Sequence, residues 1–343
     1  MLRPGTFLLP GRGFNLGPFL WTHQNAQKQA GFSLCTTKPL PNRTSRYAEH
    51  MTGFRVLAAI LFALLCAPCV QASQAAVDAV GLTPKIVVAG SPELIRVRAP
   101  GADNVNGEWL GLKLQFFPGA DHVTWFALAG VDVEAPVGKS ELRITAHMKG
   151  KDADFSRDVE IHAAHYRTGA LTVAPKFVEP PPEAQKEIEA ESQIKAKVYA
   201  ASAAEPLWRG SFHAPVASQP TDSFGTRRMF NGKLASVHKG ADFRAAAGTP
   251  VHASNSGTVV LARPLYFEGN CVIIDHGLGL FTLSVHFSRI DVHEGQRVKA
   301  GDRIGLSGAT GRVTGPHLHW AVRWQGAMLD PVKLLRLNLD ALR

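Results

Sequence analysis

The sequence predicts a mainly β protein in two parts, an N-terminal immunoglobulin-like β-sandwich and a C-terminal all-β barrel or roll. Short runs of alternating apolar and polar residues, separated by Gly, Pro and Asp, predict the sandwich within residues 73–175. Dense turn signals between short β-branched runs predict the second part within residues 208–343. A Pro-rich and helix-forming stretch, residues 176–207, predicts a linker between the two parts.

The predicted strands of the sandwich are short, and each ends at a turn signal. Residues 85–88 end at Ala89-Gly90-Ser91-Pro92, and residues 94–98 alternate apolar with charged side chains. This alternation is typical of a strand with one buried face. Further strands of this kind are predicted at residues 124–128, 142–146 and 159–161.

The linker contains one predicted helix. Three prolines at residues 180–182 interrupt the strand pattern. The next 19 residues, 183–201, are rich in Glu, Lys, Gln and Ala, which are good helix formers. Their apolar residues are sparsely spaced, so we expect a short amphipathic helix with a solvated charged face.

The second part is dominated by Gly and β-branched residues. Turn signals such as Asn231-Gly232, Ser256-Gly257 and His276-Gly277 recur along it. Strands are predicted between the turns, and no long helical pattern interrupts them. The clearest predicted strands are residues 257–261, 272–275 and 318–322.

The N-terminal region has the pattern of an export signal. Arg55 precedes an apolar run, residues 56–70, which is shorter than the ~20 residues that a membrane span needs. We expect a signal peptide at residues 51–72, cleaved after Ala72, and an upstream extension at residues 1–50. An uncleaved inner-membrane anchor is the alternative interpretation.

Cysteine usage agrees with export. Three of the four cysteines, Cys35, Cys66 and Cys69, precede the expected cleavage point, and only Cys271 follows it. A single thiol makes no internal disulfide and cannot supply a cysteine-rich structural zinc site. Because Cys271 lies in an apolar strand, we expect a buried core residue and not a nucleophile.

The charge balance favours anionic surroundings without identifying a nucleic-acid binder. The formal net charge is +9 at pH 7. Lys and Arg are scattered, however, and no run of them interleaves with aromatic residues as a nucleic-acid footprint would. We therefore expect no nucleic-acid partner, and either a solvated basic surface or contact with a polyanionic cell envelope.

Histidines concentrate in the second part, where seven of the 14 fall between residues 238 and 319. Not all of them can be metal ligands, so their spacing must select among them. They are His238, His252, His276, His286, His293, His317 and His319.

Two segments have the spacing of a metal site. His317 and His319 are two apart, which on a strand places both rings on one face. One ring could then bind a metal while the other takes part in the reaction. His238 and Asp242 are four apart across Gly240, and they converge only if that turn is tight. Zinc held by two imidazoles and one carboxylate keeps a fourth position for water, as catalytic sites do.

Residues 224–334 resemble the lysostaphin/LytM-type zinc endopeptidases of peptidoglycan, and the matching motifs run in order through the segment. The sequence departs from the family pattern at Ser284 and Phe287, which flank His286. The motifs are Phe224-Gly225-Thr226-Arg227-Arg228, His238-x-x-x-Asp242, Gly248-Thr249-Pro250-Val251, Asp275-His276-Gly277, His286-Phe287-Ser288 and Gly311 to His319.

The resemblance implies roles for five residues. His238, Asp242 and His319 would bind one Zn²⁺ per chain. His286 and His317 would be the two histidines that do not bind the metal, and that transfer protons and stabilise the developing oxyanion. By the same resemblance, His276 would be structural, and the second part would have the duplicated hybrid-motif-like fold of these peptidases.

The implied function is a periplasmic zinc metalloendopeptidase that opens peptide cross-links of peptidoglycan, in the Gram-negative type the bond between D-Ala and meso-diaminopimelate. Its partners would be peptidoglycan peptide stems and, as a further possibility, a regulatory envelope protein. One alternative is a non-catalytic cell-wall-binding module or amidase activator. Another is a lysostaphin-like bacteriocin.

Overall fold

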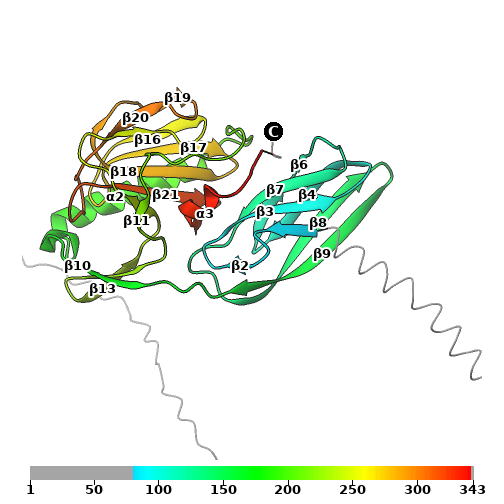
Figure 1. The fold of residues 1–343 in the computed structure, drawn as a ribbon, viewed down its shortest axis with the longest axis horizontal. Helices are drawn as coiled ribbons and strands as arrows, with labels where there is room; N and C mark the ends of the chain where they lie inside the picture. The colour runs from blue at the N-terminus through cyan, green and yellow to red at the C-terminus, as the bar shows by residue number, and fades with distance from the viewer. Residues whose placement is uncertain (1–79, 341–343) are drawn as a thin grey trace, which may run out of the picture. The chain divides into compact units, whose positions relative to one another are not determined.

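The computed structural model describes residues 80–340, which all belong to one compact unit, residues 61–343 (Figure 1). The predicted extension at residues 1–50 and signal peptide at residues 51–72 lie outside the described residues, with Cys35, Cys66 and Cys69. Most regular structure between residues 80 and 340 is β-strand, and one long helix accompanies it. The predicted mainly β fold is confirmed.

The first part of the described chain forms two sheets that share one buried hydrophobic cluster. The first sheet has the order β1 (Val80–Thr83), β3 (Pro92–Arg98), β7 (Thr124–Gly130) and β6 (Phe117–Pro118). The second has the order β2 (Val87–Val88), β9 (Lys151–His162), β8 (Gly138–Met148), β4 (Ala102–Trp109) and β5 (Leu112–Gln115).

Period-2 patterning explains how these two sheets bury their inner faces. Ile95 and Val97 on β3, and Leu142 and Ile144 on β8, are at most 1% exposed, while the residues between them are more exposed. Strands β4 and β5 were missed by the sequence analysis. The alternation of β4 is interrupted by Asn and Gly, and Trp109 is the one large residue that it buries, whereas β5 is only four residues long.

One short element and one long helix connect the first part to the second. They are the 3₁₀ turn η1 (Pro175–Phe177) and the helix α2 (Pro182–Ala200). Helix α2 begins at the last of the three prolines, as expected from proline's preference for the first helical turn. The charged face expected to be solvated makes specific contacts instead: the Glu191 carboxylate accepts from the Tyr266 backbone N–H, and Lys195 pairs with Glu268.

The second part contains a sheet of ten strands, most of them antiparallel neighbours. Its main order is β11 (Pro220–Asp222), β14 (Ala241–Phe243), β21 (Leu318–Trp324), β18 (Leu280–Ile290), β17 (Gly269–Gly277), β16 (Gly257–Leu265) and β19 (Arg297–Val298). Three more strands pair off this path, and a short terminal helix, α3 (Pro331–Leu334), follows them. The three are β15 (Pro250–His252), β20 (Arg303–Ser307) and β22 (Ala327–Leu329).

Strand β18 lies in the middle of this sheet and buries side chains on both faces. Phe287 joins the main core, whereas Phe281 and Val285 join a second cluster with Cys271. Tyr199 and other apolar residues of α2 pack against that second cluster, so α2 covers one face of the sheet. Cys271 is fully buried there, and its prediction as a core residue is confirmed.

A small third sheet lies along the linker. It has the order β10 (Thr168–Leu171), β12 (Arg227–Phe230) and β13 (Lys233–Val237), and β10 runs parallel to β12. Residues 168–171, which fall in the segment predicted as sandwich, therefore pair with a strand of the second part. This pairing holds the start of the linker beside the residues that precede His238.

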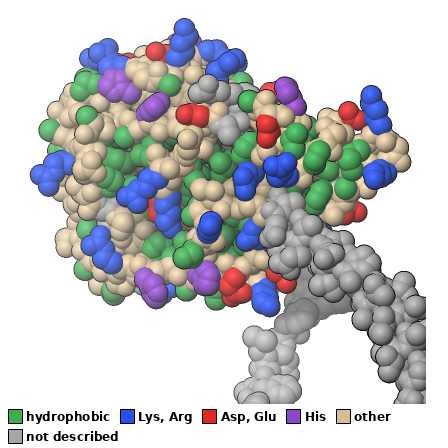
Figure 2. Space-filling model, turned by 45° about the vertical axis from the view of Figure 1, so that its right-hand side comes forward, with side chains coloured by type: hydrophobic (Ala, Val, Ile, Leu, Met, Phe, Trp, Pro, Cys, Tyr) green, Lys and Arg blue, Asp and Glu red, His purple; other side chains and the backbone are tan. Residues whose placement is uncertain are grey.

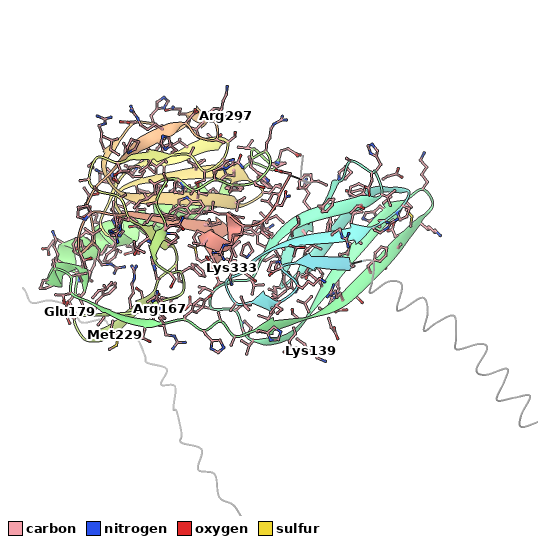
Figure 3. All side chains as sticks on the ribbon, viewed as in Figure 1. Lys139, Arg167, Glu179, Met229, Arg297 and Lys333 are labelled. Atoms are coloured by element: carbon pink, nitrogen blue, oxygen red, sulfur yellow. The ribbon has the colours of Figure 1, made fainter. Side chains whose placement is uncertain are left out.

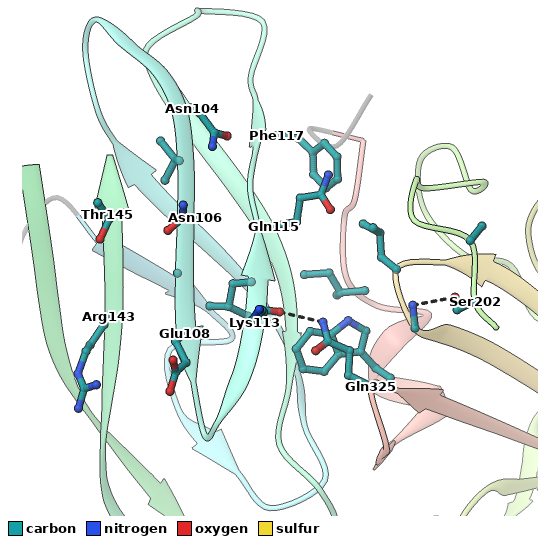
Figure 4. A pocket seen from close by; sticks show the side chains of 18 of the residues that line it. Asn104, Asn106, Glu108, Lys113, Gln115, Phe117, Arg143, Thr145, Ser202 and Gln325 are labelled. Carbon is teal, nitrogen blue, oxygen red and sulfur yellow. Dashed lines mark hydrogen bonds between the residues drawn. The ribbon is translucent and has the colours of Figure 1, made fainter. Parts of the chain in front are cut away.

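Strand β5 and the loop after β7 also contact the β21–β22 hairpin of the second part. The Gln325 side-chain amide donates to the Lys113 carbonyl at 2.8 Å, as Figure 4 shows. The Met328 backbone N–H donates to the Asp132 carboxylate at 2.7 Å. These bonds tie the turn after β21 to the first part.

The surface agrees with the scattered charge of the sequence. On the face drawn in Figure 2, Lys and Arg side chains are spread among other residues and form no continuous stripe. Among residues 80–340, no helix combines the length and the apolar character needed to cross a membrane.

His276 is one of the residues that hold the second part together. It is fully buried, its Nδ1 donates to the Ser256 carbonyl at 2.7 Å, and its Nε2 lies 2.9 Å from the Thr282 hydroxyl. His276, Ser256 and Thr282 line none of the three cavities described below, which agrees with the structural role that the resemblance implied. Burial lowers the pKa of His276 to about 4, well below the 6.5 of an unperturbed ring.

We expect His276 to make folding sensitive to acid. The unfolded chain protonates this ring near pH 6.5 and the folded chain only near pH 4, so its neutral form stabilises the fold above pH 6.5. This contribution, about 3 kcal/mol, is lost as the pH falls toward 4. Denaturant unfolding at several pH values should show a shallower acid loss for His276→Gln than for wild type. An unchanged pH slope in that variant would contradict this prediction, and His293→Gln, at an exposed position, is the control.

Candidate metal centre

Sheet register brings the first two candidate ligands together. Asp242 on β14 lies directly opposite His319 on β21 in the antiparallel pairing of these strands. Opposite residues in such a pair have Cβ atoms ~4.5–5.5 Å apart, close enough to share one ion. The His319 Nδ1 lies 2.8 Å from the Asp242 Oδ1.

The third candidate ligand enters from the turn before β14. His238 follows the last residue of β13, and its ring is 2% exposed. Its Nε2 lies 3.1 Å from the Asp242 Oδ1 and 2.9 Å from the His319 Nδ1. The three ligand atoms therefore converge on one point, although 81 residues separate His238 from His319.

Gly240 is required here by close approach. A Cβ at this position would lie 2.5 Å from the His319 Cε1 and 2.8 Å from the Trp320 carbonyl oxygen. The backbone of Gly240 is not left-handed, so its conformation alone would accept another residue. The glycine therefore makes room for the His319 ring, which is a different reason from the tight turn expected from the sequence.

Backbone hydrogen bonding fixes which nitrogen of His238 faces the ligand atoms. The Nδ1 lies 3.0 Å from the Ser223 carbonyl, which can only accept, so Nδ1 carries the proton. In the neutral ring, Nε2 then presents a lone pair toward the Asp242 carboxylate. Two electron-rich atoms at this distance repel each other unless a proton, as in the doubly protonated ring, or a metal cation lies between them.

The Asp242 carboxylate is held in its charged form. Burial would raise its pKa, but the hydrogen bonds and charges of His238 and His319 outweigh burial and keep the pKa well below its usual value. The Arg228 guanidinium, on β12, donates to the other oxygen, Oδ2. Oδ1 is thereby left to face the two imidazoles.

The two remaining histidines lie beside these ligand atoms. His286 is on β18 with a left-handed backbone, φ +67°, at a point where the strand departs from regular pairing. His317 comes one residue before β21, where it bridges to Gly308. Their ring centroids are 5.0 Å apart, and the His317 Nε2 is 3.7 Å from the Asp242 Oδ1.

Both of these rings are oriented by carbonyl groups. The His286 Nδ1 donates to the Thr310 carbonyl at 2.8 Å, and the His317 Nδ1 donates to the Gly315 carbonyl at the same distance. Each neutral ring therefore has an unprotonated Nε2. Burial, followed by the neighbouring His319 and His317, lowers the pKa of His286 to about 3. His286 is thus neutral near pH 7, the form that accepts a proton.

Two adjoining cavities give access to these residues. One, of about 440 Å³, is lined by His238, His286 and His319. The other, of about 290 Å³, is lined by Asp242, His286 and His317. His286 thus lies where the two cavities meet. A third cavity of about 950 Å³ lies along β4 and β5, and none of the five candidate residues lines it (Figure 4).

Other residues that were singled out in the sequence lie away from this centre. His252 is half-buried on β15 and His293 is exposed, and neither lines the two cavities. Ser284 and Phe287, the departures from the family pattern, are both buried. Phe287 packs into the main core, so its side chain does not face the cavities.

The sequence analysis missed the contact between Arg228 and Asp242. The motif that contains it was recognised, but no pattern indicated that its guanidinium would reach Asp242. The two are joined because β12 and the β13–β14 segment run side by side, with the Arg227 and Val237 positions paired. Only that pairing could have identified it.

Comparison with known proteins gives matches that centre on this region. Residues 236–331 match Peptidase family M23. The chain is 41% identical over 138 residues to the peptidoglycan DD-endopeptidase ShyA of Vibrio cholerae. It is 42% identical over 98 residues to the DD-carboxypeptidase/endopeptidase Mpg of Neisseria meningitidis serogroup B. Among solved structures, a Pseudomonas aeruginosa protein assigned provisionally to peptidase M23 is 26% identical with a TM-score of 0.56.

The extent of these matches differs. The match to ShyA covers 39% of this chain and 31% of that protein, and the match to Mpg covers 29% and 23%. The chain therefore spans less than a third of the length of these curated relatives. The structural match covers 72% of this chain and 94% of the Pseudomonas aeruginosa protein.

We predict that Arg228 strengthens metal binding by orienting Asp242. Arg228→Ala should lower the affinity for Zn²⁺ by about 10- to 100-fold, because groups that orient a ligand typically contribute this much. Competition with a chromophoric chelator measures the change. Arg227→Ala, at the adjacent exposed position of β12, is the matched control. Equal affinities in the Arg228 variant and wild type would show that Asp242 needs no orienting partner.

Proposed function

Residues 236–331 form a peptidase family M23 domain, and from this premise we propose that the protein is a zinc metalloendopeptidase that hydrolyses peptide cross-links of peptidoglycan. We further propose that it is exported to the periplasm, and that the bond it cleaves joins D-Ala to meso-diaminopimelate. The relatives described as peptidoglycan DD-endopeptidases support this choice of substrate.

The observation that carries the proposal is the convergence of the His238, Asp242 and His319 ligand atoms, 2.8–3.1 Å apart. A tetrahedral zinc ion with bonds of ~2.0–2.1 Å separates its ligand atoms by about 3.3 Å. The three atoms thus need to move apart by only a few tenths of an ångström. Two nitrogens and one carboxylate oxygen are also the ligands typical of a catalytic zinc site.

A zinc ion held there supplies Lewis-acid activation of water and of the scissile carbonyl. The chain itself supplies the proton transfers. His286 and His317 both have an unprotonated Nε2, which can take a proton from the attacking water. The protonated ring can later donate to the leaving amine. Because the Thr310 and Gly315 carbonyls fix both rings, each is oriented before substrate binds.

The main alternative is a non-catalytic cell-wall-binding module or amidase activator. The presence of all five candidate residues in one place favours the hydrolase. Zinc analysis of the purified protein, together with turnover of cross-linked muropeptides, distinguishes the two. Bound zinc with product formation supports the hydrolase, whereas the absence of both supports the module.

We predict that His319→Ala abolishes zinc binding and hydrolysis together. Removing one of three protein ligands leaves too few donors to hold the ion against solvent. Metal analysis by mass spectrometry should find zinc content reduced from about one per chain to a small fraction. Retention of stoichiometric zinc would contradict the role given to His319.

We predict a different result for the two histidines that do not bind the metal. His317→Ala and His286→Ala should keep zinc while turnover falls by about 10²- to 10⁴-fold, the usual contribution of a proton-transfer group. Turnover and zinc content are measured on the same samples, with His293→Ala as the surface control. Near-normal turnover in either variant would remove that residue from the mechanism.

A further inference from the structure

We propose that Arg312 binds a carboxylate of the substrate next to the metal centre, so that the enzyme selects peptides with a free carboxylate beside the scissile bond. This inference rests on the proposed function and names a specificity-determining residue for it. The sequence analysis assigned no role to Arg312, although it lies in the segment from Gly311 to His319.

The position of Arg312 is fixed by its surroundings. Its backbone N–H donates to the Phe267 carbonyl at 2.8 Å. The preceding Gly311 has φ +77°, and a Cβ there would lie 2.3 Å from the Gly269 backbone nitrogen. The guanidinium carbon then lies 4.7 Å from the ring centroid of Phe230 and 4.7 Å from that of Phe267. Two aromatic rings on different segments thus hold one side chain.

This packing leaves the donors of Arg312 available. Cations stack over the faces of aromatic rings, whereas the N–H groups of a guanidinium lie in its own plane. Arg312 lines both cavities of the candidate centre, together with His286 and Arg228. A carboxylate in either cavity could therefore receive two parallel N–H groups, which is the geometry that arginine provides.

Arg312 differs from three of the four other cations that line these cavities in having no charge partner, and the fourth, Arg323, stacks on Tyr199 and lines only the larger of the two. Arg228 pairs with Asp242, Lys195 pairs with Glu268, and Lys239 pairs with Glu134. Among residues 80–340, by contrast, no carboxylate lies within 4.0 Å of the Arg312 side chain, which contacts the two aromatic rings. Arg312 thus makes no ion pair within the described chain, and Glu268 attracts its charge only from a longer distance.

The cleft as a whole favours an anion. The walls of the two cavities together contain five cations and two carboxylates, those of Glu268 and Asp242. Burial, with repulsion from Arg228, lowers the pKa of Arg312, although the guanidinium stays charged at neutral pH. A substrate carboxylate would relieve that repulsion. The cations are Lys195, Arg228, Lys239, Arg312 and Arg323.

The test uses two substrates that differ in one group. A cross-linked muropeptide is prepared with the diaminopimelate carboxylate beside the scissile amide either free or amidated, and kcat/KM is measured for both. Arg312→Gln removes the charge, and Arg312→Lys keeps the charge but loses the paired donors. Arg297→Gln is the control, because Arg297 is exposed on β19 at the far end of the sheet order from β14 and β21 (Figure 3).

We expect the wild type to prefer the free carboxylate. Arg312→Gln should lower kcat/KM on that substrate by about 10- to 100-fold, the effect of one lost hydrogen-bonded charge, and far less on the amidated one. The preference between the two substrates should then nearly vanish. Arg312→Lys should fall between the two, and Arg297→Gln should match the wild type. Zinc content and thermal unfolding of each variant identify any loss caused by misfolding.

Three results would overturn the inference. If the wild type cleaves both substrates at one rate, the proposed hydrolase stands but Arg312 does not recognise a carboxylate. If Arg312→Gln loses activity equally on both substrates, Arg312 only holds Phe230 and Phe267 in place and does not recognise a carboxylate. If the wild type cleaves neither substrate while it binds zinc, the proposed function itself fails, and the inference fails with it.

Discussion

The pairing of β14 with β21 is the constraint on which the candidate centre depends. It sets Asp242 opposite His319, and the register of the sheet, not the distance along the chain, decides that they meet. A shift of one residue would turn one of the two side chains to the other face. Gly240 protects this arrangement, because the His319 ring occupies the space that any other side chain would need. His238 then joins the two from the turn before β14.

Main-chain carbonyl groups also organise the centre, because they orient its histidine rings. Three of them, from Ser223, Thr310 and Gly315, each receive the Nδ1 proton of a different histidine. Ser223 is far in the sequence from the other two, which belong to one loop, and the histidines that they orient all line the two cavities. Each bond leaves Nε2 unprotonated, so one tautomer is set for the ring that would bind metal and for the two that would transfer protons. The chemistry of the site therefore depends on loop positions as much as on side chains.

The linker and the strand just before it help to build the site as well as to connect the two parts. Strand β10 pairs with β12, the strand of Arg228, and helix α2 covers one face of the sheet and pairs Lys195 with Glu268. Because Glu268 pairs with Lys195, it makes no ion pair with Arg312 and attracts that charge only from a longer distance. The two cavities thus combine paired cations that stabilise the fold with Arg312, which makes no ion pair and lines both of them. That combination suits an anionic peptide substrate.

The sequence by itself predicted the mainly β fold and the position of helix α2 to within one residue, and it named five candidate residues, His286 among them only through the family resemblance. These were accessible because period-2 patterning, helix-forming composition and short motif spacing are local properties. Strands β4 and β18 were missed, since interrupted alternation and burial on both faces hide the period. Only the tertiary structure decided that Gly240 makes space for His319, that Arg228 reaches Asp242 and that two rings hold Arg312. Each of these depends on the register between strands and on loops far apart in the chain, which no local pattern encodes.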